Sequence, residues 1–141
     1  MRRILRISAI VVVPILVLAG IGIFIASGPS PSCFFPKDGP LQAGISARTL
    51  LSGEKKRCYL LYAPSSLDPA QPIPIVFSLH GFASNPTGQR FLSRWERIAD
   101  RETFLVIYPQ GSSSPMRWNS ALFPNMDEID DVRLYCLLRN E

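Results

Sequence analysis

The segment from Ile73 to Gly81, with the sequence IPIVFSLHG, constrains the fold of this 141-residue chain more than any other feature. Its apolar residues form a run that is typical of a strand buried on both faces of a sheet. The run stops at His80-Gly81 and is followed by a polar loop over residues 82–87. Because ligands of open α/β sheets bind at the carboxyl ends of the strands, the sequence predicts an α/β fold with a candidate binding loop at that edge.

Residues 1–28 are predicted to be a membrane segment. Three arginines precede residues 7–26, which are mostly aliphatic and uncharged, and about 20 apolar residues are enough to cross a bilayer. The segment is either a signal-anchor helix or a signal peptide cleaved near Ala26-Ser27-Gly28. Since Lys and Arg beside a membrane segment stay on the cytoplasmic side, we expect the rest of the chain outside the cytoplasm. This part of the chain is then either anchored to the membrane, with the amino terminus in the cytoplasm, or secreted.

The remainder divides into a tether and a domain. Residues 29–43 are rich in Ser, Pro and Gly and are expected to be an extended tether. Residues 44–141 are expected to form the domain, which opens with a hairpin of strands 47–51 and 57–63. The second of these strands is apolar on both sides, so both of its faces are expected to be covered.

A strand–helix–strand unit is predicted after the hairpin. The helix is expected to start at Asn85-Pro86, with Asn as the N-cap, and to run to about Glu102. Residues 104–108 (FLVIY) form the next strand, parallel to the first. The helix stripe expected to face the sheet consists of Phe91, Leu92, Trp95, Ile98 and Ala99.

A last helix is predicted to begin near residues 127–130. Its expected buried side consists of Ile129, Val132, Tyr135 or Cys136, and Leu138.

Charge and cysteine content narrow the class of protein. The net charge is +4, but without the three N-terminal arginines twelve basic and eleven acidic residues remain. No basic stripe is visible, so nucleic acid is not an expected partner. Three cysteines (Cys33, Cys58 and Cys136) allow at most one internal disulfide, and the sequence leaves the pairing open. With a single histidine and no cysteine pair at metal-ligand spacing, no metal site is expected.

Several spaced motifs resemble those of one known family. In chain order they are RCYLLYAPSSLDPAQPIPIVFSLHGFASN, WERIADRETFLVIYPQG, WN and IDDV, within residues 45–138. They resemble the exported polyhydroxybutyrate depolymerase and feruloyl esterase group of α/β-hydrolases. The resemblance implies a mostly parallel sheet flanked by helices. It also implies hydrolysis of carboxylic esters by a Ser-Asp-His triad, without a metal or an organic cofactor.

Residue by residue, the resemblance implies an oxyanion loop at His80, Gly81 and Phe82. Backbone N–H groups just after His80, that of Phe82 first, would stabilise the negative charge that develops on the ester carbonyl oxygen. His80 itself is expected to be a loop residue bonded to neighbouring backbone, because the family's catalytic histidine lies far downstream. The candidate substrate-pocket residues are Ser84, Asn85, Trp118 and Asn119; for Trp118, packing is the alternative. Asp130-Asp131 is expected to cap the last helix.

The triad itself is not expected within this sequence. GSSSP at residues 111–115 lacks the second glycine of G-x-S-x-G, so it is not a nucleophile elbow. The resemblance places the nucleophile, acid and base beyond Glu141. It therefore implies the amino-terminal half of an esterase, inactive alone, which acts on an ester only when the missing half completes it. The alternative is a non-catalytic membrane-anchored protein, whose exposed sheet edge pairs with a complementing fragment, or a gene relic.

Overall fold

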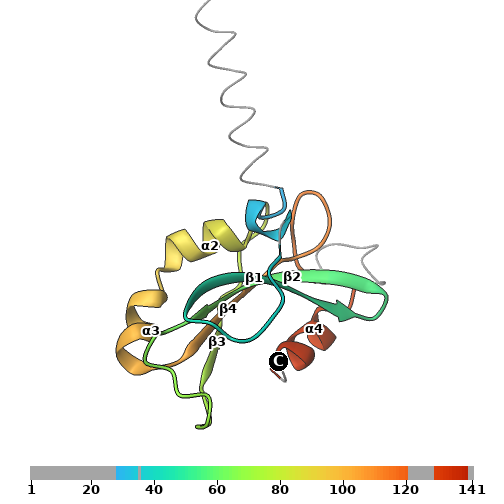
Figure 1. Cartoon of the computed structure of the whole chain (residues 1–141). Coiled ribbons are helices and arrows are strands. Elements are labelled where there is room, and N and C mark those ends of the chain that lie inside the picture. Colours follow the sequence, from blue (N-terminus) through green and yellow to red (C-terminus); the bar gives the residue numbers. More distant parts are fainter. Residues whose placement is uncertain (1–27, 35, 121–128, 140–141) are drawn as a thin grey trace, which may run out of the picture.

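The computed structural model describes residues 28–34, 36–120 and 129–139 (Figure 1). The predicted membrane segment falls on residues 1–28 and so lies almost entirely outside them. Within the described residues, no helix has the length and apolar character needed to span a bilayer.

Four strands form one mixed sheet in the order β1-β2-β4-β3. β1 (Gly44–Ser52) and β2 (Lys55–Ala63) pair antiparallel around a tight turn, in which Gly53 has a φ of +65°. β2 also pairs antiparallel with β4 (Leu105–Pro109), and β4 pairs parallel with β3 (Ile75–Phe77). The predicted hairpin and parallel pair are confirmed, within an α/β arrangement.

β3 differs from its prediction. It has three residues, all half-buried, and within the described part of the chain it pairs with β4 alone. Its side chains alternate between the two faces of the sheet, with Ile75 and Phe77 packed against the apolar cluster on one face and Val76 against that on the other, so the expected burial on both faces is observed but is partial. β4 lies between β2 and β3 and so has a strand on each side.

The predicted long helix is divided in two. α2 (Pro86–Ser93) and α3 (Glu96–Glu102) are separated by Arg94, whose φ of 52° is left-handed and ends the first helix. The break changes the direction of the chain, so a single apolar stripe does not form. Phe91 and Leu92 are 76% and 79% exposed, and only Ala99 of the predicted stripe is fully buried.

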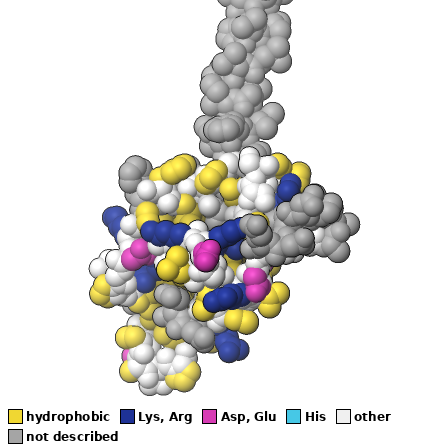
Figure 2. All heavy atoms as spheres, turned by 90° about the vertical axis from the view of Figure 1, so that its right-hand side faces the viewer, with side chains coloured by type: hydrophobic (Ala, Val, Ile, Leu, Met, Phe, Trp, Pro, Cys, Tyr) yellow, Lys and Arg dark blue, Asp and Glu magenta, His cyan; other side chains and the backbone are white. Residues whose placement is uncertain are grey.

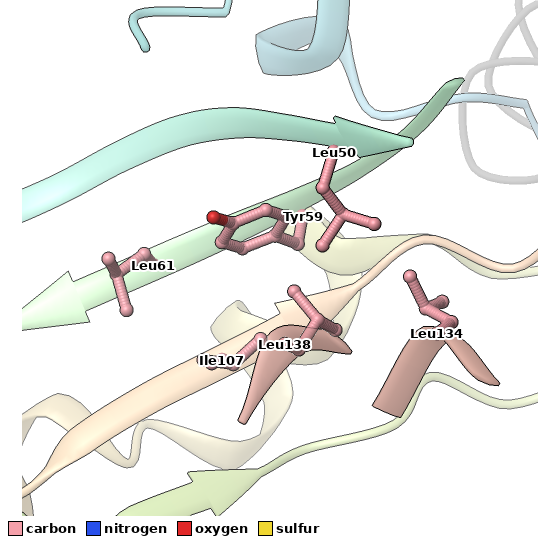
Figure 3. Close-up of a cluster of buried hydrophobic side chains, with 6 residues drawn as sticks. All are labelled: Leu50, Tyr59, Leu61, Ile107, Leu134 and Leu138. Atoms are coloured by element: carbon pink, nitrogen blue, oxygen red, sulfur yellow. The ribbon is translucent and has the colours of Figure 1, made fainter. Parts of the chain in front are cut away.

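Two apolar clusters lie on opposite faces of the sheet. On one face α3 covers a cluster of Leu60, Ala99, Phe104, Val106 and Tyr108. On the other, α4 (Asp131–Leu138) closes a cluster of Leu50, Tyr59, Leu61, Ile107, Leu134 and Leu138 (Figure 3). The alternation of β2 and β4 side chains between the clusters confirms that β2 is covered on both faces.

α4 begins at Asp131, after the N-cap Asp130, whose side chain accepts the Arg133 N–H at 2.7 Å. With that start the buried side consists of Asp131, Leu134 and Leu138. The prediction is therefore confirmed at Leu138 and wrong at Val132, which is 72% exposed. Of the two alternatives in the predicted buried side, Tyr135 is half-buried and Cys136 is exposed.

The segment expected to be a tether packs along the hairpin. A short 3₁₀ helix, η1 (Pro31–Phe34), carries Cys33, which forms a disulfide with Cys58 of β2. Further on, the Lys37 N–H bonds to the Ala47 carbonyl at 2.8 Å. Figure 2 shows basic and acidic side chains side by side on one face of the molecule, with apolar side chains between them.

Candidate functional site

Two loops leave the sheet next to each other because β3 and β4 are adjacent parallel strands. The first loop, residues 78–85, follows β3, and the second loop, residues 110–120, follows β4. The Ser78 N–H still bonds to the Ile107 carbonyl at 2.9 Å, so the first loop departs from a fixed point of the sheet. Both loops therefore start at the carboxyl edge, where α/β sheets bind ligands.

His80 joins the two loops. Its Nε2 accepts the backbone N–H of Gly111 at 3.0 Å, and its Nδ1 lies 2.8 Å from the carbonyl oxygen of Gly81. Since Nε2 accepts a hydrogen bond, the proton of the neutral ring lies on Nδ1, which donates to Gly81. His80 is 2% exposed, and this burial lowers its pKa below the usual value. With both nitrogens engaged, His80 holds the loops together and is not placed to act as a general base.

Gly111 is required by close approach of the backbone. A Cβ at this position would lie 2.6 Å from the carbonyl oxygen of Arg117 and 3.1 Å from Cε1 of His80. Ser112 and Arg117 pair through N···O distances of 2.9 and 3.0 Å, which closes the second loop on itself. The GSSSP stretch is thus part of a tight backbone loop.

Two more hydrogen bonds join the loops. The Ala83 N–H donates to the Met116 carbonyl at 2.9 Å, and Trp118 Nε1–H donates to the His80 carbonyl at 2.7 Å. The Trp118 ring lies 4.8 Å from the His80 ring and 6.0 Å from that of Tyr135 on α4, centroid to centroid. Burial raises the pKa of Tyr135. These contacts support packing as the role of Trp118.

Asn119 connects the second loop to α4. Its backbone N–H donates to Asp131 at 2.6 Å, and its side-chain amide donates to the Ile129 carbonyl at 2.7 Å. Asp131 also pairs with Arg57 of β2 at 2.7 Å, and these two side chains are only 9% and 6% exposed. Arg57 in turn donates to the Gln110 carbonyl at 3.1 Å. A buried ion pair therefore fixes both ends of the second loop.

The other predicted site residues surround the tip of the first loop. Asn85 is 4% exposed and caps α2, where its Oδ1 accepts the Gly88 N–H at 2.9 Å. Ser84 is half-buried, with its N–H 3.3 Å from the Gly81 carbonyl. Gly81 is exposed, and Phe82 is 59% exposed. Of the predicted residues, these last two and Asn119 are exposed to solvent.

Sequence reasoning missed the partners that fix the loops. It considered Gly111 as the first residue of GSSSP and assigned Asp131 to helix capping. A glycine two residues after the second of two parallel strands is a signal that could have found Gly111. No local signal pairs Arg57 with Asp131, which are 74 positions apart.

The chemistry available at this edge is hydrogen-bond donation from a rigid backbone. Among the residues that the structure describes, no three His, Cys, Asp or Glu side chains are grouped so that they could hold a metal ion. An edge that water reaches and that is built from fixed loops can bind a carbonyl oxygen or an anion.

No protein-family model matches this chain, whereas a comparison with individual proteins gives a partial match. Over 59 residues the chain is 41% identical to the bifunctional acetylxylan esterase/xylanase of Neocallimastix patriciarum. The match covers 42% of this chain and 8% of that protein, so the chain spans a small part of its relative's length. The relation is thus to part of a protein named for both esterase and xylanase activity, whereas membership of the polyhydroxybutyrate depolymerase and feruloyl esterase group stays a prediction.

Proposed function

We propose that the two loops form the oxyanion-binding side of a carboxylic-ester hydrolase site. In α/β-hydrolases one oxyanion donor is a backbone N–H in the loop between the third strand and the following helix. In this chain that loop is residues 78–85, between β3 and α2. The observation that carries the proposal is the bond from Gly111 N–H to His80 Nε2, which fixes this loop against its neighbour.

The roles within the proposed site follow from the geometry. The backbone N–H of Phe82 is the candidate oxyanion donor, at the exposed tip of the loop. His80, Trp118 and Asn119 position the loops, and Ser84 and Asn85 shape the turn into α2. Because the sequence holds one histidine and both of its nitrogens are engaged, a histidine base has to come from other sequence. The nucleophile is proposed to come from other sequence as well, since the sequence contains no G-x-S-x-G stretch. The relative's name makes an acetylated polysaccharide the first substrate to test.

A chimera tests this proposal. The matching 59 residues of the fungal bifunctional enzyme are replaced by those of this chain, and both of its named activities are measured. Release of acetate from acetylated xylan within about tenfold of the parent, with xylanase activity unchanged, supports the proposal. Loss of xylanase activity alone would place the matched segment in the xylanase part and contradict it. Loss of acetate release alone would show that the exchanged segment of this chain does not support ester hydrolysis, and would contradict the proposal.

The disulfide supports a location outside the cytoplasm for this chain. Disulfides persist in oxidising compartments, and Cys33 and Cys58 are joined. The proposal is that residues 7–26 hold the chain at a membrane while the described residues face the outside. A membrane-impermeant maleimide should then label the exposed Cys136 in intact cells. Labelling only after lysis contradicts this location.

A second candidate function is non-catalytic binding through the edge of β3. This candidate is favoured by β3 having β4 as its sole strand neighbour within the described residues. A complementing strand would slow amide exchange at Phe77 in a stoichiometric complex extracted from membranes. Recovery of the chain alone, with fast exchange at Phe77, would count against binding.

A further inference from the structure

Residues 28–34 lie across both site loops, and we call this segment the strap. Figure 1 shows it between α2 and the loop that follows β4. Its position is unexpected for a segment whose composition predicts a tether, because Ser30 is completely buried.

The strap is bonded to the end of the first loop. The side-chain amide of Asn85 donates to the Gly28 carbonyl at 3.2 Å, and Asn85 uses its other amide atom to cap α2. The hydroxyl groups of Ser30 and Thr87 are also hydrogen-bonded to each other. The strap therefore holds the point at which the first loop turns into α2.

The strap is bonded to the start of the second loop as well. The Ser30 N–H donates to Oε1 of Gln110 at 2.8 Å. The Gln110 N–H donates to the Cys58 carbonyl at 2.9 Å, and Cys58 forms the disulfide with Cys33 of the strap. One closed circuit thus joins the strap, β2 and the second loop, with the first loop attached to it through Asn85.

We propose that the strap positions the loop after β3 against the loop after β4, and that it does so only while the Cys33–Cys58 bond is intact. A short segment held by a few hydrogen bonds to loops frays readily, whereas a covalent link keeps it in place. The functional importance of this positioning rests on the proposed function, because an oxyanion donor stabilises the developing charge only when it is held rigidly. The positioning itself is measurable without any hydrolysis.

The redox step is thiol–disulfide exchange with a dithiol. The S–S bond breaks, the dithiol is oxidised to its cyclic disulfide, and its two hydrogens end on Cys33 and Cys58 as thiols. The reverse reaction, with a disulfide oxidant, forms the bond in an oxidising compartment. The site loops would therefore reach their final geometry only after the chain has left a reducing environment.

Amide hydrogen exchange of the full chain in detergent micelles tests the proposal. The reporters are the N–H groups of Gly111 and Ala83, which bond between the two loops. The reference is the N–H of Leu105, which bonds to Pro74 at the opposite end of β4. After reduction with dithiothreitol, exchange at the two reporters should accelerate at least about tenfold more than at Leu105.

Three variants keep the test decisive. The double variant Cys33→Ser with Cys58→Ser should reproduce the effect of the reductant, whereas Cys136→Ser should not change the exchange pattern. Gln110→Ala keeps the disulfide but removes the acceptor of Ser30, so it should give the same selective pattern at smaller size. Equal acceleration at all three amides would mean general destabilisation and would overturn the proposal, as would no change. If the chimera failed but the selective acceleration of exchange were observed, the proposed function would be refuted and the positioning role of the strap would stand.

Discussion

The carboxyl edge of the sheet and its two apolar faces are held together by different forces. At the edge, single hydrogen bonds and one ion pair join residues that are up to 80 positions apart. On the faces, many interchangeable apolar contacts hold α3 and α4 to the strands. Directional bonds between fixed partners tolerate little change, whereas apolar clusters tolerate substitutions that conserve volume. The following predictions test that contrast, beginning with the largest expected effect.

Asp131→Ala should lower the free energy of unfolding by about 3–5 kcal/mol, because it leaves the buried Arg57 guanidinium without its partner. Urea unfolding of the full chain measures this loss. The control is Glu102→Ala, which breaks a pair whose side chains are 71% and 55% exposed and should cost about 0.5 kcal/mol or less. Equal losses in the two variants would show that burial does not distinguish the pairs.

Leu134→Ala should cost about 2–5 kcal/mol, because Leu134 is fully buried in the cluster beneath α4. Leu134→Met conserves volume and should cost less than about 1.5 kcal/mol. Val132→Ala on the same helix should be nearly neutral, because Val132 is 72% exposed. A large loss for Val132→Ala, measured in the same urea series, would contradict the observed register of α4.

Gly111→Ala should cost about 1–3 kcal/mol, because the added methyl group meets the Arg117 carbonyl oxygen at 2.6 Å. It should also accelerate exchange of the Ala83 amide, since the second loop has to move. Gly81→Ala is the matched control, with nothing within 4 Å of its Cβ, and should change stability by about 0.5 kcal/mol or less. If both variants were equally stable, the close approach at Gly111 would be disproved.

The free energy of unfolding should also decrease at acid pH, because His80 binds a proton more readily in the unfolded chain than in the folded one. Its pKa in the folded state is lowered by burial, so between that value and about 6.5 the unfolded chain binds more protons than the folded one. The free energy of unfolding should therefore decrease as the pH falls below about 6.5, by at most about 1.4 kcal/mol per pH unit from this group. His80→Gln should remove that part of the slope between pH 5 and 7, and an unchanged slope would exclude His80 as its source.

The contrast between the edge and the faces of the sheet also explains which features could be predicted from the sequence and which could not. The hairpin, the strand at FLVIY and the Asn85-Pro86 helix start each depend on neighbouring residues, and all three are confirmed. The break at Arg94 was not predictable in this way, because arginine has no preference for a left-handed backbone and the packing of Ala99 decides the second helix.

The site shows the same division. The sequence locates the first loop because an apolar run ends there. It does not reveal that Gly111, Gln110 and Asp131 fix that loop and its neighbour, since these bonds join distant parts of the chain. The sequence left two roles open for Trp118, namely stacking on a substrate and packing within the protein. Its bond to the His80 carbonyl, which no local pattern predicts, supports packing.

The state of the His80 ring tests most directly whether the two loops form one rigid site. His80 is the single histidine of the chain, so its ring nitrogens give unambiguous ¹⁵N NMR signals. The structure predicts that the proton of the neutral ring lies on Nδ1, that Nε2 accepts the Gly111 N–H, and that the pKa of the ring is lowered below its ordinary value. A proton on Nε2 of the neutral ring, or a pKa at or above the ordinary value of a histidine, would contradict the joined loops and the oxyanion site proposed on them.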